Sequence, residues 1–167
     1  LFILCGAMGG QRVSDWSQFD IARILEEDGF KFMPIVQTKN RRGRRATTSF
    51  VPMTPVMIFL LERLGGTVPS FGTHAASKVR EAARLSGVFN DLIRVNGEIK
   101  PKWAKVLSHT GRRSFVTGAF EAGISVSDIG AVSGHAPGSA SIHVYNKSNG
   151  LASSKRFAQT RNIFFNQ

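Results

Sequence analysis

Glycine pairs and proline residues divide this sequence into short segments, and their positions limit the possible folds more than any other feature. Residues 1–8 are mostly apolar and predict the end of a buried helix, which Gly9-Gly10 ends. Residues 13–19 predict one or two further helical turns. Thr54-Pro55 predicts a helix start, because proline is tolerated at the first helical position, and Gly65-Gly66 ends that helix. We therefore expect short helices joined by tight turns.

One stretch of the chain has the composition of paired strands. Residues 31–38 and 47–52 are rich in β-branched and aromatic side chains and flank a polar turn around Gly43. They predict a β-hairpin whose tip is strongly cationic. The basic residues of this tip are Lys39, Arg41, Arg42, Arg44 and Arg45. The fold class expected is mainly α with a small antiparallel β-hairpin, an α+β arrangement.

The remaining segments are predicted from apolar spacing and turn residues. The helix after Thr54 is expected to bury one apolar stripe. That stripe consists of Val56, Phe59, Leu60 and Leu64. A second helix is expected over about 73–85, and a loop rich in Asn, Gly and Pro over about 95–101. Further helices are predicted at 109–122, 125–133, 139–147 and 151–165.

The balance of charges points to a polyanionic partner. The chain has 167 residues with 42% apolar content, enough to bury the core of a single domain over 1–167. Its 22 Lys and Arg against 11 Asp and Glu give a net charge of +11. Such a charge favours nucleic acid as the partner. The alternatives are a basic protein that is merely soluble and one that rests on anionic lipid.

Cysteine content and hydropathy favour a cytoplasmic setting. Cys5 is the only cysteine, so neither a disulfide nor a cysteine-based zinc site is expected. No apolar run approaches the roughly 20 residues that a membrane span needs. Because the chain opens on Leu1 in what looks like the middle of a helix, we expect a fragment whose upstream domains are missing.

The most informative segment is Ser108 to Val116. Helical positions three apart share a face, so His109 and Arg112 are expected to project together, with Arg112 on the inward stripe and Arg113 turned away. An inward guanidinium is costly unless it meets an anion, and a phosphate that accepts two hydrogen bonds is a natural partner. The alternative is a structural pair with a buried Asp or Glu.

Two further residues follow at short spacing. Gly134 can end the helix of 125–133 and leave His135 at the mouth of a turn. Tyr145, ten residues later, is the only tyrosine of the chain, so any tyrosine chemistry is its own. The alternative for a lone tyrosine is a half-buried packing residue.

Taken in order, these pieces resemble the signature of the tyrosine recombinases, the phage-integrase family, over about residues 1–147. The matching pieces are Arg12 within Gly10–Asp15, Lys39 on the hairpin, His109-Thr110-Gly111-Arg112, Gly134-His135, and Tyr145. The sequence departs from the family's common pattern at three places: Gly111 and Ser133 stand where leucine is usual, and the spacing from His135 to Tyr145 is one residue longer.

The resemblance implies the catalytic-domain fold of these DNA breaking-rejoining enzymes and a role for each matching residue. Tyr145 would be the nucleophile that holds the 3′ phosphate, without metal or cofactor. Arg12 and Arg112 would clamp the non-bridging phosphate oxygens. The proton-handling and hydrogen-bonding roles would fall to Lys39 as general acid, His109 as general base and His135 as a donor to phosphate. His143 is a lower-ranked alternative base, and His74 is expected at the surface.

The expected partner is double-stranded DNA, with integration or another site-specific recombination as the outcome. Backbone phosphates would be contacted by the cationic tip and by Lys100, Lys102, Lys105 and Arg113. A homotetramer on paired sites is expected, with residues 147–167 as a tail that packs into a neighbouring subunit or, alternatively, onto its own domain. The isolated fragment is expected to be a monomer.

Three other functions compete with recombination. A type IB topoisomerase would use the same residue types to relax supercoils. A metal-dependent nuclease needs clustered carboxylates, whereas Glu26, Glu27 and Asp28 lie together in a predicted turn without a second cluster. A DNA-binding module with inactive chemistry is the third alternative.

Overall fold

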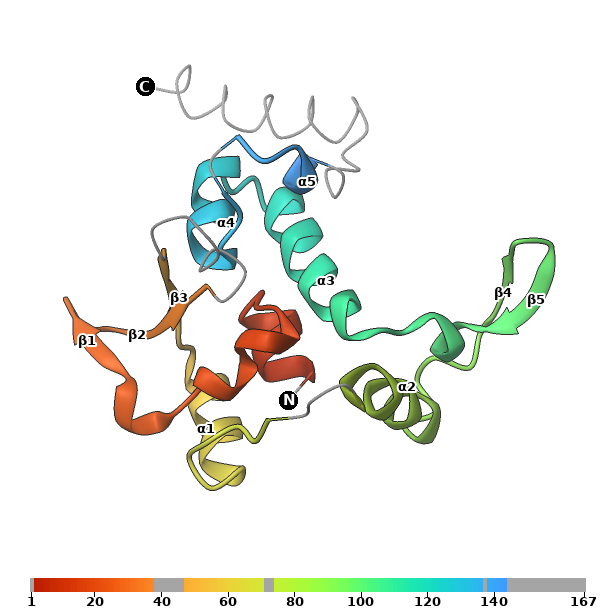
Figure 1. Ribbon diagram of the computed structural model, residues 1–167, viewed down its shortest axis with the longest axis horizontal. Coiled ribbons are helices and arrows are strands. Elements are labelled where there is room, and N and C mark those ends of the chain that lie inside the picture. Colours follow the sequence, from red (N-terminus) through yellow and green to blue (C-terminus); the bar gives the residue numbers. More distant parts are fainter. Residues whose placement is uncertain (1, 38–46, 71–73, 137, 144–167) are drawn as a thin grey trace, which may run out of the picture.

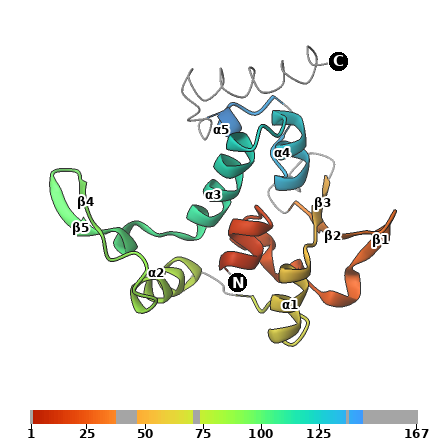
Figure 2. The ribbon, with the colours of Figure 1, turned by 180° about the vertical axis from the view of Figure 1, so that it is seen from behind.

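The computed structural model describes residues 2–37, 47–70, 74–136 and 138–143. The predicted helix at 151–165 lies outside these ranges. None of the described helices is both long enough and apolar enough to cross a membrane. In two opposite views the three-stranded sheet and the β4–β5 hairpin lie at opposite ends of the long axis, with helix α3 between them (Figures 1 and 2).

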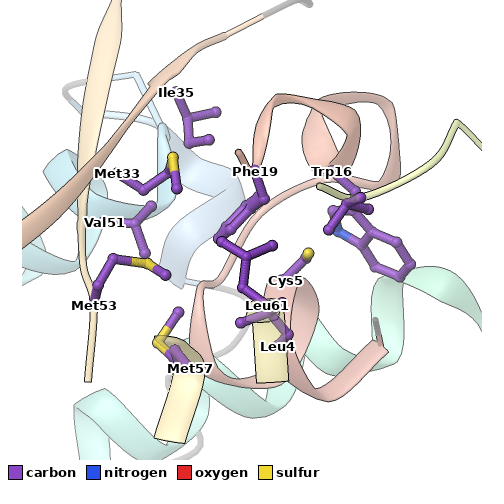
Figure 3. Packing of buried hydrophobic residues seen from close by; sticks show 11 residues of the cluster. Leu4, Cys5, Trp16, Phe19, Met33, Ile35, Val51, Met53, Met57 and Leu61 are labelled. Carbon is purple, nitrogen blue, oxygen red and sulfur yellow. The ribbon is translucent and has the colours of Figure 1, made fainter. Parts of the chain in front are cut away.

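The main core forms where the N-terminal helices meet the sheet. The π-helix η1, Phe2–Met8, and the 3-10 helix η2, Val13–Gln18, match the two predicted helical segments. Their buried side chains pack with those of the sheet and of helix α1 (Figure 3). The cluster consists of Leu4, Cys5, Trp16, Phe19, Met33, Ile35, Val51, Met53, Met57, Leu61 and Val68.

The predicted hairpin is confirmed as strands β2, Phe30–Val36, and β3, Thr48–Pro52, which pair antiparallel. A third strand, β1, Leu25–Glu27, pairs with β2, so the sheet order is β1-β2-β3. The expectation of a turn at all three acidic residues was wrong, because Glu26 and Glu27 lie in β1. Asp28 and Gly29 form the connection, with φ of 51° and 78°, as a two-residue hairpin turn requires.

Helix α1, Pro55–Arg63, begins where predicted, and the Thr54 hydroxyl accepts a hydrogen bond from the backbone N–H of Met57. Its predicted inward stripe was wrong. Met57 and Leu61 are the buried residues, whereas Val56, Phe59 and Leu64 are 56%, 53% and 38% exposed; Leu60 packs against the core as expected. Residues 56–61 are apolar on every side, so spacing alone could not select the buried face, and packing against η1 and the sheet does.

Helix α2, Ala75–Leu85, is followed by a second hairpin in place of the predicted loop at 95–101. Strands β4, Leu92–Val95, and β5, Glu98–Pro101, pair antiparallel around Asn96-Gly97, with φ of 50° and 84°. Asn-Gly is the common sequence of a type I′ turn, which allows the strands to close with their natural twist. The short 3-10 helix η6, Lys102–Lys105, leads from the hairpin to α3.

Helices α3, Ser108–Glu121, and α4, Val126–Ser133, confirm two predicted helices, and α5, Ala140–His143, confirms the start of the third. A second, smaller core cluster joins them. It consists of Val116, Phe120, Ile129 and Ile142.

Helix α3 packs against η1 at a pair of glycines. A Cβ atom on Gly111 would lie 3.0 Å from the backbone nitrogen of Ala7 and 3.0 Å from the carbonyl carbon of Gly6. A leucine at this position would therefore push the two backbones apart. Gly111, which stands where the family usually has leucine, therefore allows α3 to pack closely against Gly6 of η1. This close packing brings Arg112 near the loop that follows η1.

Candidate active site

Arg112 is the centre of the candidate site. It projects inward from α3, as predicted, and is 1% exposed, whereas Arg113 is exposed. Its Nη1 donates to the carbonyl oxygen of Gly10, at 2.9 Å, and to the carbonyl oxygen of Ser133. Its Nη2 lies 3.0 Å from Nδ1 and 3.1 Å from Nε2 of His135. These three partners are two backbone carbonyl groups and an imidazole ring.

Arg12 reaches the same end of α4 from the start of η2. Its Nη2 donates to the carbonyl oxygen of Gly134 at 3.3 Å, and its Nη1 donates to Oε1 of Gln37 at 2.7 Å. The two arginines, 100 residues apart in sequence, therefore hydrogen-bond to adjacent carbonyls of residues 133 and 134. The structure brings together Arg12, Arg112 and His135, as the resemblance implied.

The C-terminal end of α4 organises this arrangement. The last carbonyls of a helix have no partner within the helix and carry the negative end of its dipole. Here the carbonyl of Val132 accepts from Nε2 of Gln11 at 2.7 Å, that of Ser133 from Arg112, and that of Gly134 from Arg12. One helix end thus aligns one amide and two guanidinium groups.

Two buried glutamines support the arginines and were not predicted. Gln11 and Gln37 are both 0% exposed. Nε2 of Gln37 donates to Oε1 of Gln11 at 3.1 Å and to the hydroxyl of Ser49 at 3.2 Å, which leaves its own Oε1 to accept from Arg12. Gln37 is also the last described residue before Lys39, the expected general acid. Neither glutamine had a sequence signal beyond lying within two positions of a candidate residue.

His135 lies beyond the end of α4, at the turn predicted from Gly134, whose φ is +69°. Burial, followed by the charges of Arg112, Arg12 and His109, lowers the pKa of His135 from its ordinary value of 6.5 to about 4. The imidazole is therefore neutral at physiological pH. His109 is exposed on α3, one helical turn before Arg112.

The other candidates fall into two groups. Lys39, Tyr145, Arg41, Arg42, Arg44 and Arg45 lie outside the described residues. His74, at the start of α2, and His143, at the end of α5, are exposed. Lys100, Lys102 and Lys105 are exposed on β5 and η6. The β4–β5 hairpin lies far from α4 in both views (Figures 1 and 2).

His135 is expected to make folding stability depend on pH. Because its pKa is lower in the folded chain than in the unfolded chain, the unfolded chain binds more protons below about pH 6.5. Its stabilising contribution is complete above that value and is lost progressively as pH falls from about 6.5 to about 4. Since the ring is partly screened by solvent, we expect a loss on the order of 1 kcal/mol between about pH 7 and about pH 5.

Urea unfolding at these two pH values measures this effect. The variant His135→Gln should show a smaller difference between them than the wild type. His74→Gln removes an exposed histidine and serves as the matched control, with the wild-type difference retained. If the unfolding free energy of His135→Gln changed between the two pH values as much as that of the wild type, the lowered pKa of His135 would be contradicted.

Gly134 is expected to tolerate no side chain, for two separable reasons. Its φ of +69° is unfavourable for any L residue, and a Cβ atom would lie 2.0 Å from Cδ of Gln37. Gly138 has the same φ of +69° but nothing within 4 Å, so Gly138→Ala isolates the backbone cost, about 1 kcal/mol. Gly134→Ala must also displace the buried amide, for a total of roughly 2–4 kcal/mol. Equal costs in urea unfolding would show that Gln37 is not packed against Gly134.

Comparisons with known proteins show the fold class. No family model matches this sequence, and no curated protein is significantly similar to it. Solved structures do match, and they show that the chain has the fold of a tyrosine recombinase catalytic domain. The fold predicted from the resemblance is thereby confirmed.

The similar structures include two of the XerH site-specific recombinase and one of the XerA recombinase. XerH bound to a palindromic difH substrate, in a post-cleavage complex, has a TM-score of 0.54 at 16% identity over 98% of this chain and 44% of its own. XerH bound to difH in a pre-cleavage complex has a TM-score of 0.58 at 16% identity over 98% and 46%. XerA has a TM-score of 0.59 at 17% identity over 94% and 56%. The chain thus spans about half the length of these recombinases.

Proposed function

We propose that this chain is the catalytic domain of a site-specific DNA recombinase that works through a 3′-phosphotyrosine intermediate. The observation that supports this most is the convergence of Arg12 and Arg112 on successive carbonyls at the end of α4, next to a neutral His135. Two fixed guanidinium groups at one place suit a phosphodiester, whose non-bridging oxygens gain negative charge as a nucleophile attacks.

The reaction is a transesterification in which the number of phosphoester bonds is conserved. The Tyr145 oxygen forms a bond to phosphorus and the bond from phosphorus to the 5′ oxygen breaks. His109 takes the tyrosine proton, and Lys39 donates a proton to the leaving 5′ oxygen. Attack by another 5′ hydroxyl on the phosphotyrosine reverses these steps and rejoins the DNA without an external energy source.

The wider activity follows from this chemistry. The partner is double-stranded DNA, bound electrostatically by a chain of net charge +11. We propose that residues 1–167 are a single catalytic domain, that the DNA-recognition domains lie in another part of the protein, and that it acts in the cytoplasm. On paired sites it would assemble as a tetramer through residues 147–167. Arg41, Arg42, Arg44, Arg45 and Arg113 are the proposed phosphate contacts.

A suicide DNA substrate tests this proposal. A nick placed just after the scissile phosphate lets the short cleaved fragment diffuse away, so a covalent intermediate accumulates. In the presence of a metal chelator, we expect a protein–DNA band that survives denaturation. Cleavage that needs a divalent metal and leaves free 3′ ends would indicate a nuclease and overturn the proposal. Strand exchange between paired sites, as opposed to relaxation of a supercoiled circle, separates recombination from a topoisomerase activity.

A further inference from the structure

Ser133, the last residue of α4, has a hydroxyl group with two partners in a buried place. The residue is 0% exposed. Its Oγ donates to the carbonyl oxygen of Ile129 at 2.5 Å and lies 2.7 Å from Nδ1 of His135. A serine hydroxyl has a single hydrogen. Since that hydrogen is given to Ile129, the oxygen can only accept from the histidine, and Nδ1 must carry the proton.

The contact between the imidazole and Arg112 is compatible with this assignment. A guanidinium group has donors only, so the nitrogen that it meets must offer a lone pair. Nη2 of Arg112 lies 3.0 Å from Nδ1 and 3.1 Å from Nε2, and with the proton on Nδ1 only Nε2 can accept its hydrogen bond. The Arg112 contact is thus compatible with the Nδ1–H tautomer, and the hydroxyl of Ser133 is what selects it.

We propose that Ser133 is a positioning residue: it holds His135 in the Nδ1–H tautomer, and the imidazole in turn orients the guanidinium of Arg112. Where it concerns catalysis, this inference rests on the proposed function and deepens it. In this arrangement His135 acts on a bound phosphate through Arg112, because its own N–H is directed at Ser133. A leucine, the usual residue here in proteins of the resembling family, has no acceptor, so this device is a property of this chain.

The tautomer is measurable without DNA. In ¹⁵N NMR spectra of the full chain, the two ring nitrogens of a neutral histidine have well-separated shifts, and the His135 signals are assigned by their loss in His135→Gln. We expect wild-type His135 to carry its proton on Nδ1. A wild-type ring protonated on Nε2 would overturn the inference even if every variant failed to fold.

Variants then test the role of the hydroxyl. Ser133→Ala is expected to shift His135 toward the Nε2–H tautomer, and Ser133→Thr, which retains a hydroxyl, to preserve Nδ1–H. Ser114→Ala is the matched control. The Ser114 hydroxyl likewise donates to the carbonyl oxygen four residues earlier, that of Thr110, at 3.1 Å, but it lies on the exposed side of α3. An unchanged tautomer in Ser133→Ala would overturn the inference.

A kinetic measurement links the tautomer to the reaction. Ser133→Ala should slow covalent adduct formation roughly 10-fold, the size of loss expected when the partner behind a functional group is removed. Ser133→Thr should restore most of the rate. Wild-type rates in Ser133→Ala would contradict the role in catalysis. Because the NMR result needs no cleavage, a failure of the proposed recombinase activity and a failure of this inference are distinguishable.

Discussion

Replacing Tyr145 by phenylalanine is expected to abolish covalent attachment to DNA while DNA binding stays close to the wild-type level. The change removes one oxygen atom, and this is the only tyrosine of the chain. Loss of a catalytic nucleophile lowers rates by more than about 10⁴-fold, which takes the adduct below detection on a denaturing gel. A gel-shift assay with the same DNA measures binding.

The two measurements together make the result specific. Loss of the adduct with binding retained assigns the chemistry to Tyr145. An adduct that persists in Tyr145→Phe would place the nucleophile elsewhere. Loss of binding together with the adduct would show that the residue supports the structure of the DNA interface and would contradict a purely chemical role.

Replacing Arg112 by lysine is expected to slow adduct formation on the order of 10²–10³-fold. Lysine retains the charge but presents all its donors from one nitrogen. The guanidinium instead uses Nη1 to contact Gly10 and Ser133 and Nη2 to contact His135. An ammonium group at this buried position would leave carbonyl oxygens without donors, at a cost of roughly 1–3 kcal/mol for each. Urea unfolding measures that cost separately from the rate.

The neighbouring residue supplies the control. Arg113 is exposed on α3 and is a proposed phosphate contact whose charge lysine retains, so Arg113→Lys should leave stability unchanged and slow cleavage far less than Arg112→Lys does. Arg12→Lys, at a half-buried position, should slow cleavage with a smaller loss of stability. If Arg112→Lys and Arg113→Lys had the same rate, the phosphate clamp would not lie on the inward face of α3.

Local features of the site were predictable from sequence because local rules produce them. Helical spacing placed Arg112 inward and Arg113 outward, and Gly134 ended α4 in a left-handed conformation, with φ of +69°. The antiparallel hairpin β2–β3 followed from its composition and turn residues. These elements position two of the three groups that meet at the site.

The supporting network was not predictable in this way. The hydrogen bond from Gln11 to the carbonyl of Val132 spans 121 positions, and only tertiary packing creates it. A glutamine is usually a surface residue, so its type alone gives no sign of burial. Ser133 was noted only as a departure from the family pattern, although its hydroxyl contacts His135.

Other errors had signals that were available. Asp28-Gly29 and Asn96-Gly97 both have the sequence of a two-residue hairpin turn, but an acidic cluster and an Asn-, Gly- and Pro-rich stretch are also typical of longer loops. The buried face of α1 could not have been predicted from the sequence, because an all-apolar segment has no periodic pattern that distinguishes one face from another. In that case the neighbouring elements decide which side is buried.

The attachment point of the DNA tests the central claim most directly. Wild-type protein would be trapped on a suicide substrate in the presence of a metal chelator, digested with protease and nuclease, and analysed by mass spectrometry. The account predicts a nucleotide joined through its 3′ phosphate to the peptide that contains Tyr145. A nucleotide on any other residue, or cleaved DNA with free 3′ ends and no attached peptide, would contradict it.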